Sequence, residues 1–398
     1  MKRPFDITIV GAGMTGLGLA ALLANDSRCA VRVIDAGPPP EFDPAADVGL
    51  RVSALAPGTV ELLERVDAWQ RVLDRRASPY ERMQVWDAAA SPDGPATVCF
   101  DASEFAVAEL GFIVENELVR FALYEALQSS QVIFDFEQPI DAIDRRRGRW
   151  EVRHADTVTD AELIVGADGG RSFVRDAADI DIELTPYQQT ALVTHVTPER
   201  SHERTALQRF LPSGPIGMLP LADGRVSIVW STSPAEAEKA SAMSDADLGT
   251  RLTEVSDRVL GSLTVAGPRG TFPLAAAHAE NYVEAGLALI GDAAHSVHPL
   301  AGQGVNLGFA DVAALADVIV EAFDAGEYPA DRPVLRRYER ARRGANAGMI
   351  RLLTGLNGLF AADSTLVGEL RRAGMLLFNR SGPIRKKAVD IAFGTSRR

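Results

Sequence analysis

The sequence has few cysteines and no long apolar run. Among 398 residues only Cys29 and Cys99 are cysteines, too few for a disulfide framework and without the spacing of a metal site. No run of about 18 apolar residues occurs, so no helix is expected to span a bilayer. No charged leader with an apolar core precedes the first strand, so no secretory signal is expected. These absences predict a cytoplasmic protein, which can still contact the inner face of the membrane peripherally.

An excess of positive charge is also missing. The chain carries 41 Lys and Arg against 54 Asp and Glu, a formal net charge of -13. A surface that binds nucleic acid neutralises phosphates with basic side chains, so this balance argues against a nucleic-acid partner. Hydrophobic residues make up 46% and charged residues 24% of the chain, which is typical of a globular protein with a large core.

A glycine-rich turn follows directly on the first predicted strand. Residues 6–10 (DITIV) have the pattern of a buried strand, and the sequence then reads Gly-Ala-Gly-Met-Thr-Gly before an apolar helical stretch. In such a unit the first glycine allows the tight turn, the second lets the backbone approach a pyrophosphate, and the third lets helix and strand pack closely. We therefore predict dinucleotide binding at Gly11, Gly13, Thr15 and Gly16, where the helix N-terminus offers unpaired N–H groups.

The next predicted strand, residues 30–35 (AVRVID), completes a βαβ unit and ends in Asp35. An acid at this place can accept hydrogen bonds from the ribose of an adenosine. The turn and the acid together predict a bound dinucleotide, but they do not distinguish FAD from NAD.

The rest of the chain separates into a β-rich middle and a helical end. Short strand patterns recur over residues 180–272, whereas helical patterns occupy 116–127, 304–323 and the residues after Pro333. We predict an α/β fold: a discontinuous Rossmann-like cofactor domain (1–179 and 273–335), an inserted β-sheet substrate domain (180–272) and a C-terminal helical region (336–398).

Two further segments place acids at the ends of predicted strands. Residues 165–175 (VGADGGRSFVR) contain Asp168, and residues 291–308 (GDAAHSVHPLAGQGVNLG) contain Asp292. In the second segment a turn at Gly302 and Gly304 opens a helix. An acid there can bind the hydroxyls of a sugar-like chain, and the helix N-terminus can stabilise negative charge on a flavin ring.

In this order, the three segments resemble the class A flavoprotein monooxygenases, the family of para-hydroxybenzoate hydroxylase. The resemblance implies that Asp168 belongs to a motif tied to both FAD and NAD(P)H, and that Asp292 binds the ribityl chain of FAD. It places Pro299 beside the reactive edge of the isoalloxazine, with a carbonyl that can accept a proton contact. Val305 and Asn306 would contact the far edge of the ring through their backbone.

The likeness is closest to the ubiquinone-biosynthesis hydroxylases. It is carried by residues 51–55 (RVSAL), 111–116 (GFIVEN), 214–221 (GPIGMLPL), 291–308 and 383–394, and it places Arg51 and Asn116 among the FAD-binding residues. One departure is Asp35, where these families commonly have glutamate.

The resemblance implies an FAD-dependent monooxygenase that hydroxylates a phenolic ring with NAD(P)H and O2. It explains why only one dinucleotide fingerprint is present, since this family reduces its flavin without a second Rossmann domain. A polyprenylated ubiquinone precursor is the expected substrate. The alternatives are the same chemistry on another aromatic compound, and a flavin-binding accessory subunit of a biosynthetic complex without hydroxylase activity. The sequence does not predict the oligomeric state.

Several histidines and arginines leave more than one interpretation open. His295 and His298 could bind a metal, act as acid or base, or shape the loop; a metal is not predicted, because further ligands are missing. His298 joins Pro299 as a catalytic candidate. His195 and Arg209, on predicted strands, either face substrate or are ordinary structural residues.

Two basic stretches of the sequence also allow two interpretations each. The arginines of residues 145–149 form either a solvated hairpin tip, which the flanking strand patterns favour, or a phosphate-binding patch. The chain from Arg336 onward mixes basic clusters with apolar helical positions. Such a pattern indicates either a packed helical cap or a surface that contacts anionic lipid or a partner.

Overall fold

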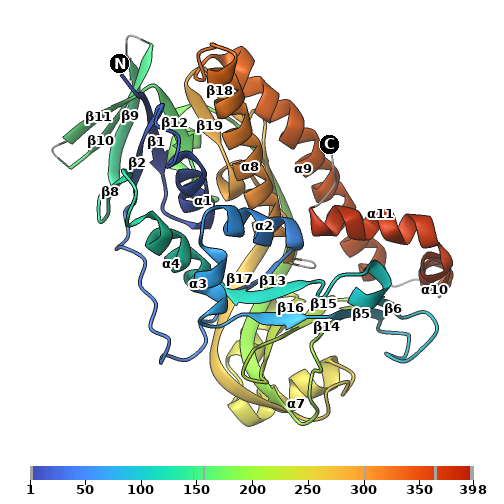
Figure 1. Cartoon of the computed structure of the whole chain (residues 1–398). Helices are drawn as coiled ribbons and strands as arrows, with labels where there is room; N and C mark the ends of the chain where they lie inside the picture. Colours follow the sequence, from blue (N-terminus) through green and yellow to red (C-terminus); the bar gives the residue numbers. More distant parts are fainter. Residues whose placement is uncertain (1–2, 147, 156, 300–301, 363–364, 395–398) are drawn as a thin grey trace.

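The computed structural model describes residues 3–146, 148–155, 157–299, 302–362 and 365–394 (Figure 1). A six-stranded sheet lies at the centre of the cofactor domain, in the order β18-β19-β12-β1-β2-β8. Strand β1 pairs in parallel with β2 and β12, and β12 pairs in parallel with β19, so their carboxyl ends meet at one edge. The strands are β1 (Phe5–Val10), β2 (Cys29–Ile34), β8 (Ile133–Asp135), β12 (Leu163–Gly166), β18 (Val283–Glu284) and β19 (Leu287–Leu289).

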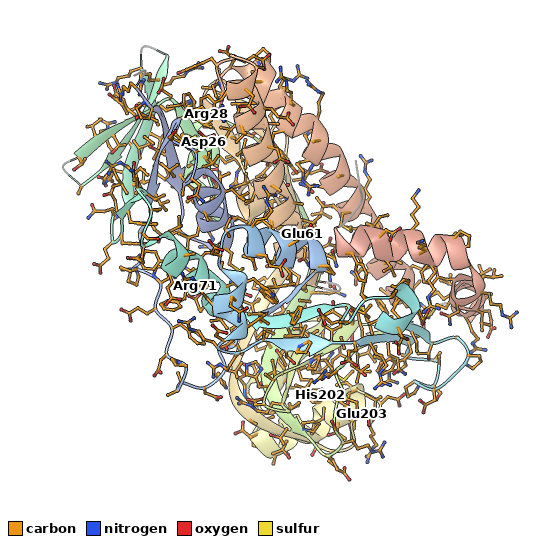
Figure 2. All side chains as sticks on the ribbon, viewed as in Figure 1. Asp26, Arg28, Glu61, Arg71, His202 and Glu203 are labelled. Carbon is orange, nitrogen blue, oxygen red and sulfur yellow. The ribbon has the colours of Figure 1, made fainter. Side chains whose placement is uncertain are left out.

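Helices cover one face of this sheet. Helix α1 (Met14–Leu23) contacts both α4 (Asn116–Leu127) and α8 (Gln303–Asp324). Most of α1 is buried, which explains why its sequence is apolar around the whole helix rather than along one stripe. The turn between α1 and β2 is held by Arg28, whose side chain lies beside Asp26 and donates to it at 2.6 Å (Figure 2).

A three-stranded antiparallel sheet packs its buried side chains into the same core. It consists of β9 (Ile140–Arg146), β10 (Arg149–His154) and β11 (Thr157–Ala161), and Trp150 and Val152 belong to the core. The arginine-rich stretch lies at the turn between β9 and β10, as the hairpin interpretation predicted, although Arg147 is outside the described residues.

The β-rich lobe is an eight-stranded sheet in the order β20-β17-β13-β16-β15-β14-β5-β6. The sequence predicted it within 180–272, but β5 and β6 come from residues 82–101, because β14 pairs in parallel with β5. Helices α6 (Pro234–Ser241) and α7 (Asp245–Val255) pack on this sheet. Its strands are β5 (Arg82–Asp87), β6 (Val98–Asp101), β13 (Ile182–Pro198), β14 (Thr205–Leu211), β15 (Gly214–Pro220), β16 (Val226–Thr232), β17 (Leu263–Ala279) and β20 (His295–Ser296).

A smaller sheet, in the order β3-β7-β4, lies beside the cofactor domain. Its strands are β3 (Val52–Leu55), β7 (Gly111–Glu115) and β4 (Ser78–Tyr80), and the short helices nearby are α2 (Pro57–Arg65), α3 (Trp69–Leu73) and α5 (Phe173–Ala177). Strand β7 leads directly into α4, so Asn116 lies where the strand ends and the helix begins.

The chain ends in three helices, α9 (Arg332–Ala361), α10 (Thr365–Arg380) and α11 (Gly382–Phe393), drawn in red tones in Figure 1. Helix α9 packs along α8, and its Leu353 and Phe360 join Phe210 of β14 in an apolar cluster. The helical end therefore connects the cofactor domain with the β-rich lobe. Within the described ranges, no helix combines the length and the apolar character needed to cross a bilayer.

Candidate active site

The ends of three parallel strands meet at the glycine-rich turn. Gly11 follows β1 with a φ of 106°, and a Cβ atom on it would lie 2.3 Å from the carbonyl oxygen of Ala167, which follows β12. A Cβ on Gly16 would lie 1.9 Å from the carbonyl oxygen of Gly11. Because both neighbours are backbone atoms that cannot move aside, only glycine fits at these two positions.

The turn also contacts the segment that begins 280 residues later. A Cβ on Gly291, after β19, would lie 3.0 Å from Thr15, and a Cβ on Gly308 would lie 2.7 Å from the same side chain. Thr15 thus packs between Gly308 of α8 and Gly291 in the segment that precedes this helix. The strand ends at Gly11 and Gly291 therefore lie close together, with one strand, β12, between β1 and β19.

A cavity of about 680 Å³ opens where these elements meet. Ten of the residues predicted to bind the cofactor or to act in catalysis line it: Gly13, Thr15, Arg51, Asn116, Asp292, His298, Pro299, Gly302, Gly304 and Val305. Another five, Gly11, Gly16, Asp35, Asp168 and Asn306, are not part of its lining. The cavity extends to the β-rich lobe, where its walls include apolar side chains of β13, β14 and β16 such as Val193, Leu207 and Val229.

The N-termini of two helices lie at the wall of this cavity. Helix α1 begins after Gly13 and α8 after Gly302, and neither has a side-chain cap or an acid in its first turn. A Cβ built on Gly13 would meet no atom within 4 Å, so the space in front of the turn is open. An open glycine before an uncapped helix fits a pyrophosphate, and the second N-terminus fits the negative charge of a reduced flavin. The residues present therefore suit FAD.

The residues outside the cavity lining support the turns. Asp35 ends β2, and its carboxylate accepts from the backbone N–H groups of Ala12 at 2.5 Å and Gly37 at 2.7 Å. A carboxylate has about four acceptor sites, so the ribose contact predicted for Asp35 stays compatible with this geometry. Asp168 accepts from the Ser172 hydroxyl at 2.6 Å and from Val174 N at 3.2 Å, which fixes the start of α5.

Asn306 joins the α8 turn to the small sheet with its side chain. Its Nδ2 donates to the carbonyl of Ala54 at 2.9 Å, and its Oδ1 accepts from Ala56 N at 2.9 Å and from the Thr59 hydroxyl at 2.8 Å. Gly302, with a φ of 63°, also packs on Ala54, because a Cβ on it would lie 2.9 Å from that residue's Cβ. Asn306 thus places the backbone of the turn, while its predicted contact to the isoalloxazine stays a prediction.

Asp292 contributes a carboxyl group to the wall of the cavity. Its side chain is open to the cavity, yet the surrounding protein withdraws it from bulk water, and this desolvation raises its pKa. The nearby charges of His295 and Arg51 oppose that shift. Arg51 lies over the ring of Phe272, 5.7 Å from its centroid, and so is positioned from the β-rich side of the cavity.

Behind Asp292 lies a buried charge network that the sequence did not predict. His295 Nε2 lies 2.5 Å from Asp311 Oδ2, and Asp311 Oδ1 accepts from Arg342 Nε at 2.8 Å and Asn346 Nδ2 at 3.1 Å. Asp311 also accepts from Gly291 N at 3.2 Å. Burial alone would raise the pKa of Asp311, but the charges and hydrogen bonds of His295 and Arg342 hold it below its usual value. The network ties α9 to the Gly291 turn.

Arg120 is a second residue that sequence reasoning missed. It lines the cavity from α4, and its Nε donates to the carbonyl of Ala12 at 2.8 Å. A guanidinium beside the glycine turn suits a pyrophosphate. The sequence spacing could have indicated Arg120, because it follows the predicted FAD-binding residue Asn116 by four positions and so lies on the same face of α4.

The histidines separate into different roles. His295 belongs to the charge network, whereas His298 lines the cavity and has its Nε2 3.0 Å from Gln189 Oε1. His195 is buried and pairs with the Gly49 carbonyl at 3.1 Å, and Arg209 donates to the Val255 carbonyl at 2.9 Å; neither lines the cavity. In the described ranges, no three His, Cys, Asp or Glu side chains are arranged to hold a metal.

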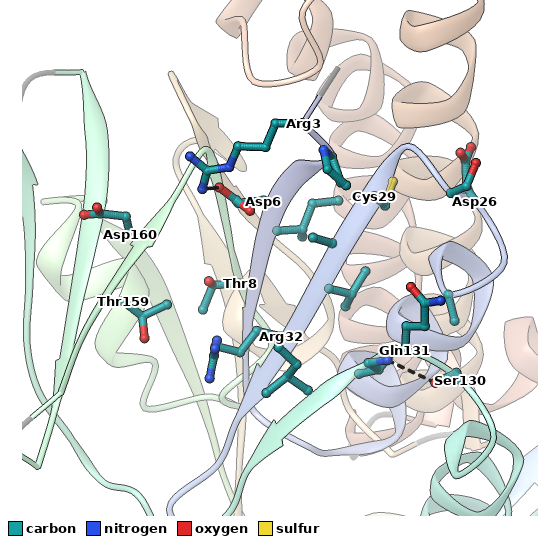
Figure 3. Close-up of a pocket in the computed structure, with 18 of the residues that line it drawn as sticks. Arg3, Asp6, Thr8, Asp26, Cys29, Arg32, Ser130, Gln131, Thr159 and Asp160 are labelled. Atoms are coloured by element: carbon teal, nitrogen blue, oxygen red, sulfur yellow. Dashed lines mark hydrogen bonds and ion pairs between the residues drawn. The ribbon is translucent and has the colours of Figure 1, made fainter. Parts of the chain in front are cut away.

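A second hollow, of about 720 Å³, lies at the opposite end of the strands (Figure 3). Its wall carries Arg3, Asp6 and Arg32, and these charges are already paired: Arg3 with Asp6, and Arg32 with Asp135. None of the residues predicted to bind cofactor lines it. We assign the chemistry to the first cavity.

The comparisons with known proteins agree with this geometry. The family described as "FAD binding domain" matches residues 5–352, so the chain belongs to this family. The solved structure of p-nitrophenol 4-monooxygenase PnpA from Pseudomonas putida has the same fold, with a TM-score of 0.79 and 18% identity over 100% of both chains. The chain is an FAD-dependent monooxygenase, with FAD as cofactor and NAD(P)H as reductant.

Two curated relatives show which group of FAD-dependent monooxygenases the chain is similar to. The chain is 36% identical over 398 residues to "3-demethoxyubiquinol 3-hydroxylase" of Escherichia coli, which covers 99% of each chain. It is 31% identical over 438 residues to the human "Ubiquinone biosynthesis monooxygenase COQ6, mitochondrial", covering 98% of this chain and 92% of the relative. The resemblance to the ubiquinone-biosynthesis hydroxylases is confirmed.

Proposed function

We propose that the enzyme hydroxylates the phenolic ring of a polyprenylated ubiquinone precursor. The observation that carries this proposal is the full-length similarity to relatives named for such a step. The cavity supports it as well, because one cavity is lined both by residues predicted to bind the flavin and by apolar side chains of the β-rich lobe such as Val193, Leu207 and Val229. The second candidate function is the same hydroxylation of another aromatic compound, since no described residue by itself demands a prenyl chain.

Bound FAD, once reduced by NAD(P)H, supplies the activation of O2. One oxygen atom enters the ring at a C–H position and the other leaves as water, with two electrons from NAD(P)H. In our proposal Gly13, Thr15 and Arg120 bind the pyrophosphate and Asp35 binds the adenosine ribose. Asp292 binds the ribityl chain, and the backbone of Val305 and Asn306 meets the pyrimidine edge of the flavin.

The other residues of the cavity position the substrate and exclude water. Pro299 follows His298 on the wall, and its carbonyl accepts a hydrogen bond from Gly302 N at 3.3 Å. Tyr80 lines the substrate side, and burial raises its pKa to about 12, so its phenol stays protonated at neutral pH. An apolar wall keeps bulk water from the reacting ring.

Loss of the gene tests the substrate assignment. We expect a deletion strain to lose ubiquinone and to accumulate a prenylated phenol that lacks one ring hydroxyl, as measured by mass spectrometry of lipid extracts. The unmodified gene should restore ubiquinone, whereas a gene with Asp292→Ala should not. Normal ubiquinone in a strain without a redundant hydroxylase would exclude the quinone precursor, and labelled O2 incorporated into a small phenol would then favour the second candidate.

We further propose that helices α9–α11 contact an anionic membrane surface, from which a prenylated substrate enters. Residues 336–398 contain fourteen Lys and Arg against four Asp and Glu, although the whole chain has a net charge of -13. Each helix also exposes a pair of large apolar side chains seven residues apart, which places them on one side of the helix. The pairs are Leu352 and Leu359, Leu370 and Leu377, and Ile384 and Ile391.

Vesicle flotation tests this surface. We expect the holoenzyme to float with vesicles that contain phosphatidylglycerol and to float less at high salt, because salt screens surface charge. Leu377→Glu should weaken binding about tenfold, since burying a leucine contributes about 1.5–3 kcal/mol. Leu184→Glu, at a leucine of similar exposure on β13, is the matched control. Equal flotation of both variants, or none with anionic vesicles, would contradict the proposal.

A further inference from the structure

An amide without a hydrogen-bond partner faces the cavity from the β-rich lobe. The side chain of Gln208, on β14, lines the cavity and is 9% exposed. Neither its Oε1 nor its Nε2 has a partner among the described residues, yet neither atom is fully buried. Ser227 lines the same wall, but its hydroxyl oxygen is buried. The amide of Gln208 is therefore a polar group that a ligand in this cavity can reach.

The pairing of β14 places this side chain on the cavity side of the sheet. Successive side chains of a strand point to opposite faces. The next residue, Arg209, reaches the other face, where it donates to the carbonyl of Val255 at the end of α7. Gln208 is paired with Gly217 of β15, and a Cβ on Gly217 would have the Val229 carbonyl oxygen as its nearest atom, at 3.8 Å. The position beside Gln208 on β15 thus leaves the space next to the amide open.

A row of apolar residues continues from the amide across the sheet. Gly217 is paired with Val229 of β16, and Val229 with Val193 of β13, so these residues follow Gln208 in one row. All four line the cavity. The row therefore has one polar end, followed only by glycine and valine. This order suits a ring that carries oxygen at one position and hydrocarbon elsewhere.

The amide of Gln208 can present either of its two polar atoms to a ligand. No hydrogen bond to the described residues holds Oε1 or Nε2, so the amide is free to turn about its last side-chain bond. The carbonyl oxygen has two lone pairs that accept from donors such as a phenolic O–H. A polar atom that stays unpaired after a ligand has excluded water is costly. A ligand is thus favoured when it brings a hydrogen-bonding group to Gln208.

We propose that Oε1 of Gln208 accepts a hydrogen bond from the phenolic hydroxyl of the substrate, whose hydrocarbon part lies over Gly217, Val229 and Val193. This inference rests on the proposed function, in which the substrate is a prenylated phenol. The proton stays on the substrate oxygen, because a carboxamide is far too weak a base to remove it. Sites built to hydrogen-bond a hydroxyl reject analogues that lack it. Gln208 is thereby a substrate-binding residue that distinguishes a phenol from the same ring without oxygen.

Equilibrium binding to the FAD-loaded protein tests the inference without turnover. The probes are 2-prenylphenol and prenylbenzene, which differ only in the ring oxygen, and their dissociation constants are measured by equilibrium dialysis in the absence of NAD(P)H. Gln208→Met keeps the length of the side chain but removes the amide. We expect it to shift the ratio of the two dissociation constants toward prenylbenzene by about tenfold or more, because the bound hydroxyl then lacks its partner.

Two further substitutions separate recognition from structure. Gln84→Met makes the same change on the neighbouring strand β5, where the side chain donates to the carbonyl of Pro92 and does not line the cavity, so the ratio should stay unchanged. Gln208→Glu retains an oxygen acceptor in place of Oε1 and should keep most of the affinity for the phenol. Stoichiometric FAD in each variant shows that the fold is intact, and Gln208→Leu replaces Gln208→Met if the latter loses its FAD.

The outcomes distinguish this inference from the function on which it rests. If the unmodified protein binds neither probe, the prenylated phenol itself is excluded and the proposed function fails with it. If the unmodified protein binds the phenol but Gln208→Met leaves the ratio where it was, the role of Gln208 is overturned while the proposed hydroxylation stands. The same holds if Gln208→Glu shifts the ratio as far as Gln208→Met does, because packing and not the amide oxygen would then be responsible.

Discussion

Replacing Gly13 with alanine is expected to leave the protein folded and to remove most of its FAD binding. The N-cap backbone at Gly13 has a φ of -74°, which alanine adopts readily, and a Cβ there would meet no protein atom within 4 Å. The same methyl group would occupy the space from which the pyrophosphate approaches the helix N-terminus. Losing one charge-assisted hydrogen bond costs about 1.5–3 kcal/mol, so FAD affinity should fall about tenfold to a hundredfold.

Titration of the apoprotein with FAD, followed by flavin fluorescence, measures this effect beside thermal unfolding of the apoprotein. Gly344→Ala on α9 is a matched control, because its Cβ also meets nothing within 4 Å but lies far along the chain from the turn. Gly16→Ala should behave differently from both, since its Cβ would collide with the backbone of Gly11 and destabilise the apoprotein itself. Unchanged FAD affinity in Gly13→Ala would remove the pyrophosphate from this turn.

Asp311→Asn is expected to produce the largest loss of stability. Asp311 is fully buried and is the only described carboxylate that pairs with His295 and Arg342, so its neutralisation leaves two buried basic groups without compensation. Breaking a buried ion pair by removing one partner costs about 3–5 kcal/mol. The unfolding midpoint in urea should fall accordingly, and FAD binding should weaken because Gly291 N loses its acceptor.

Asp324→Asn on the same helix is the control. Asp324 is exposed and pairs with Arg28 at 2.7 Å, a surface salt bridge whose loss should cost less than about 1 kcal/mol. The pH dependence gives a second check on Asp311. Its pKa in the folded state lies below the unfolded value, so the carboxylate stabilises the protein above the unfolded pKa and stops doing so as the pH falls through the folded pKa. The stability difference between the unmodified protein and Asp311→Asn should therefore shrink in acid, and a constant difference would contradict the charge argument.

Local chemistry explains what the sequence could predict. The strand, glycine turn and helix around Gly11 lie within about twenty residues, and each glycine has a steric reason that is visible in its spacing. The segment from Gly291 to Gly308 is similarly self-contained, so Asp292, Gly302 and Gly304 were found together. Helix α4, whose predicted bounds of 116–127 agree with the structure, shows a clear apolar periodicity.

The parts that escaped prediction depend on pairing between distant segments. Strand β5 joins the β-rich sheet through β14, and no local pattern tells an edge strand which distant sheet it enters. The Asp311–Arg342 pair joins two helices whose relative rotation is set by packing. The contact between His298 and Gln189 joins two residues that lie 109 positions apart in the chain.

The order of strands in the central sheet has a consequence for synthesis on the ribosome. Strand β19 covers the open side of β12, yet β12 ends at Gly166 and β19 begins at Leu287. At translation rates of roughly 5–20 residues per second, a nascent chain carries β12 as an uncovered edge for on the order of ten seconds. All four residues of that strand are buried in the finished protein, so the emerging chain presents an apolar template for aggregation until β19 has been synthesised. Production at high expression levels is therefore expected to benefit from chaperones or slow induction.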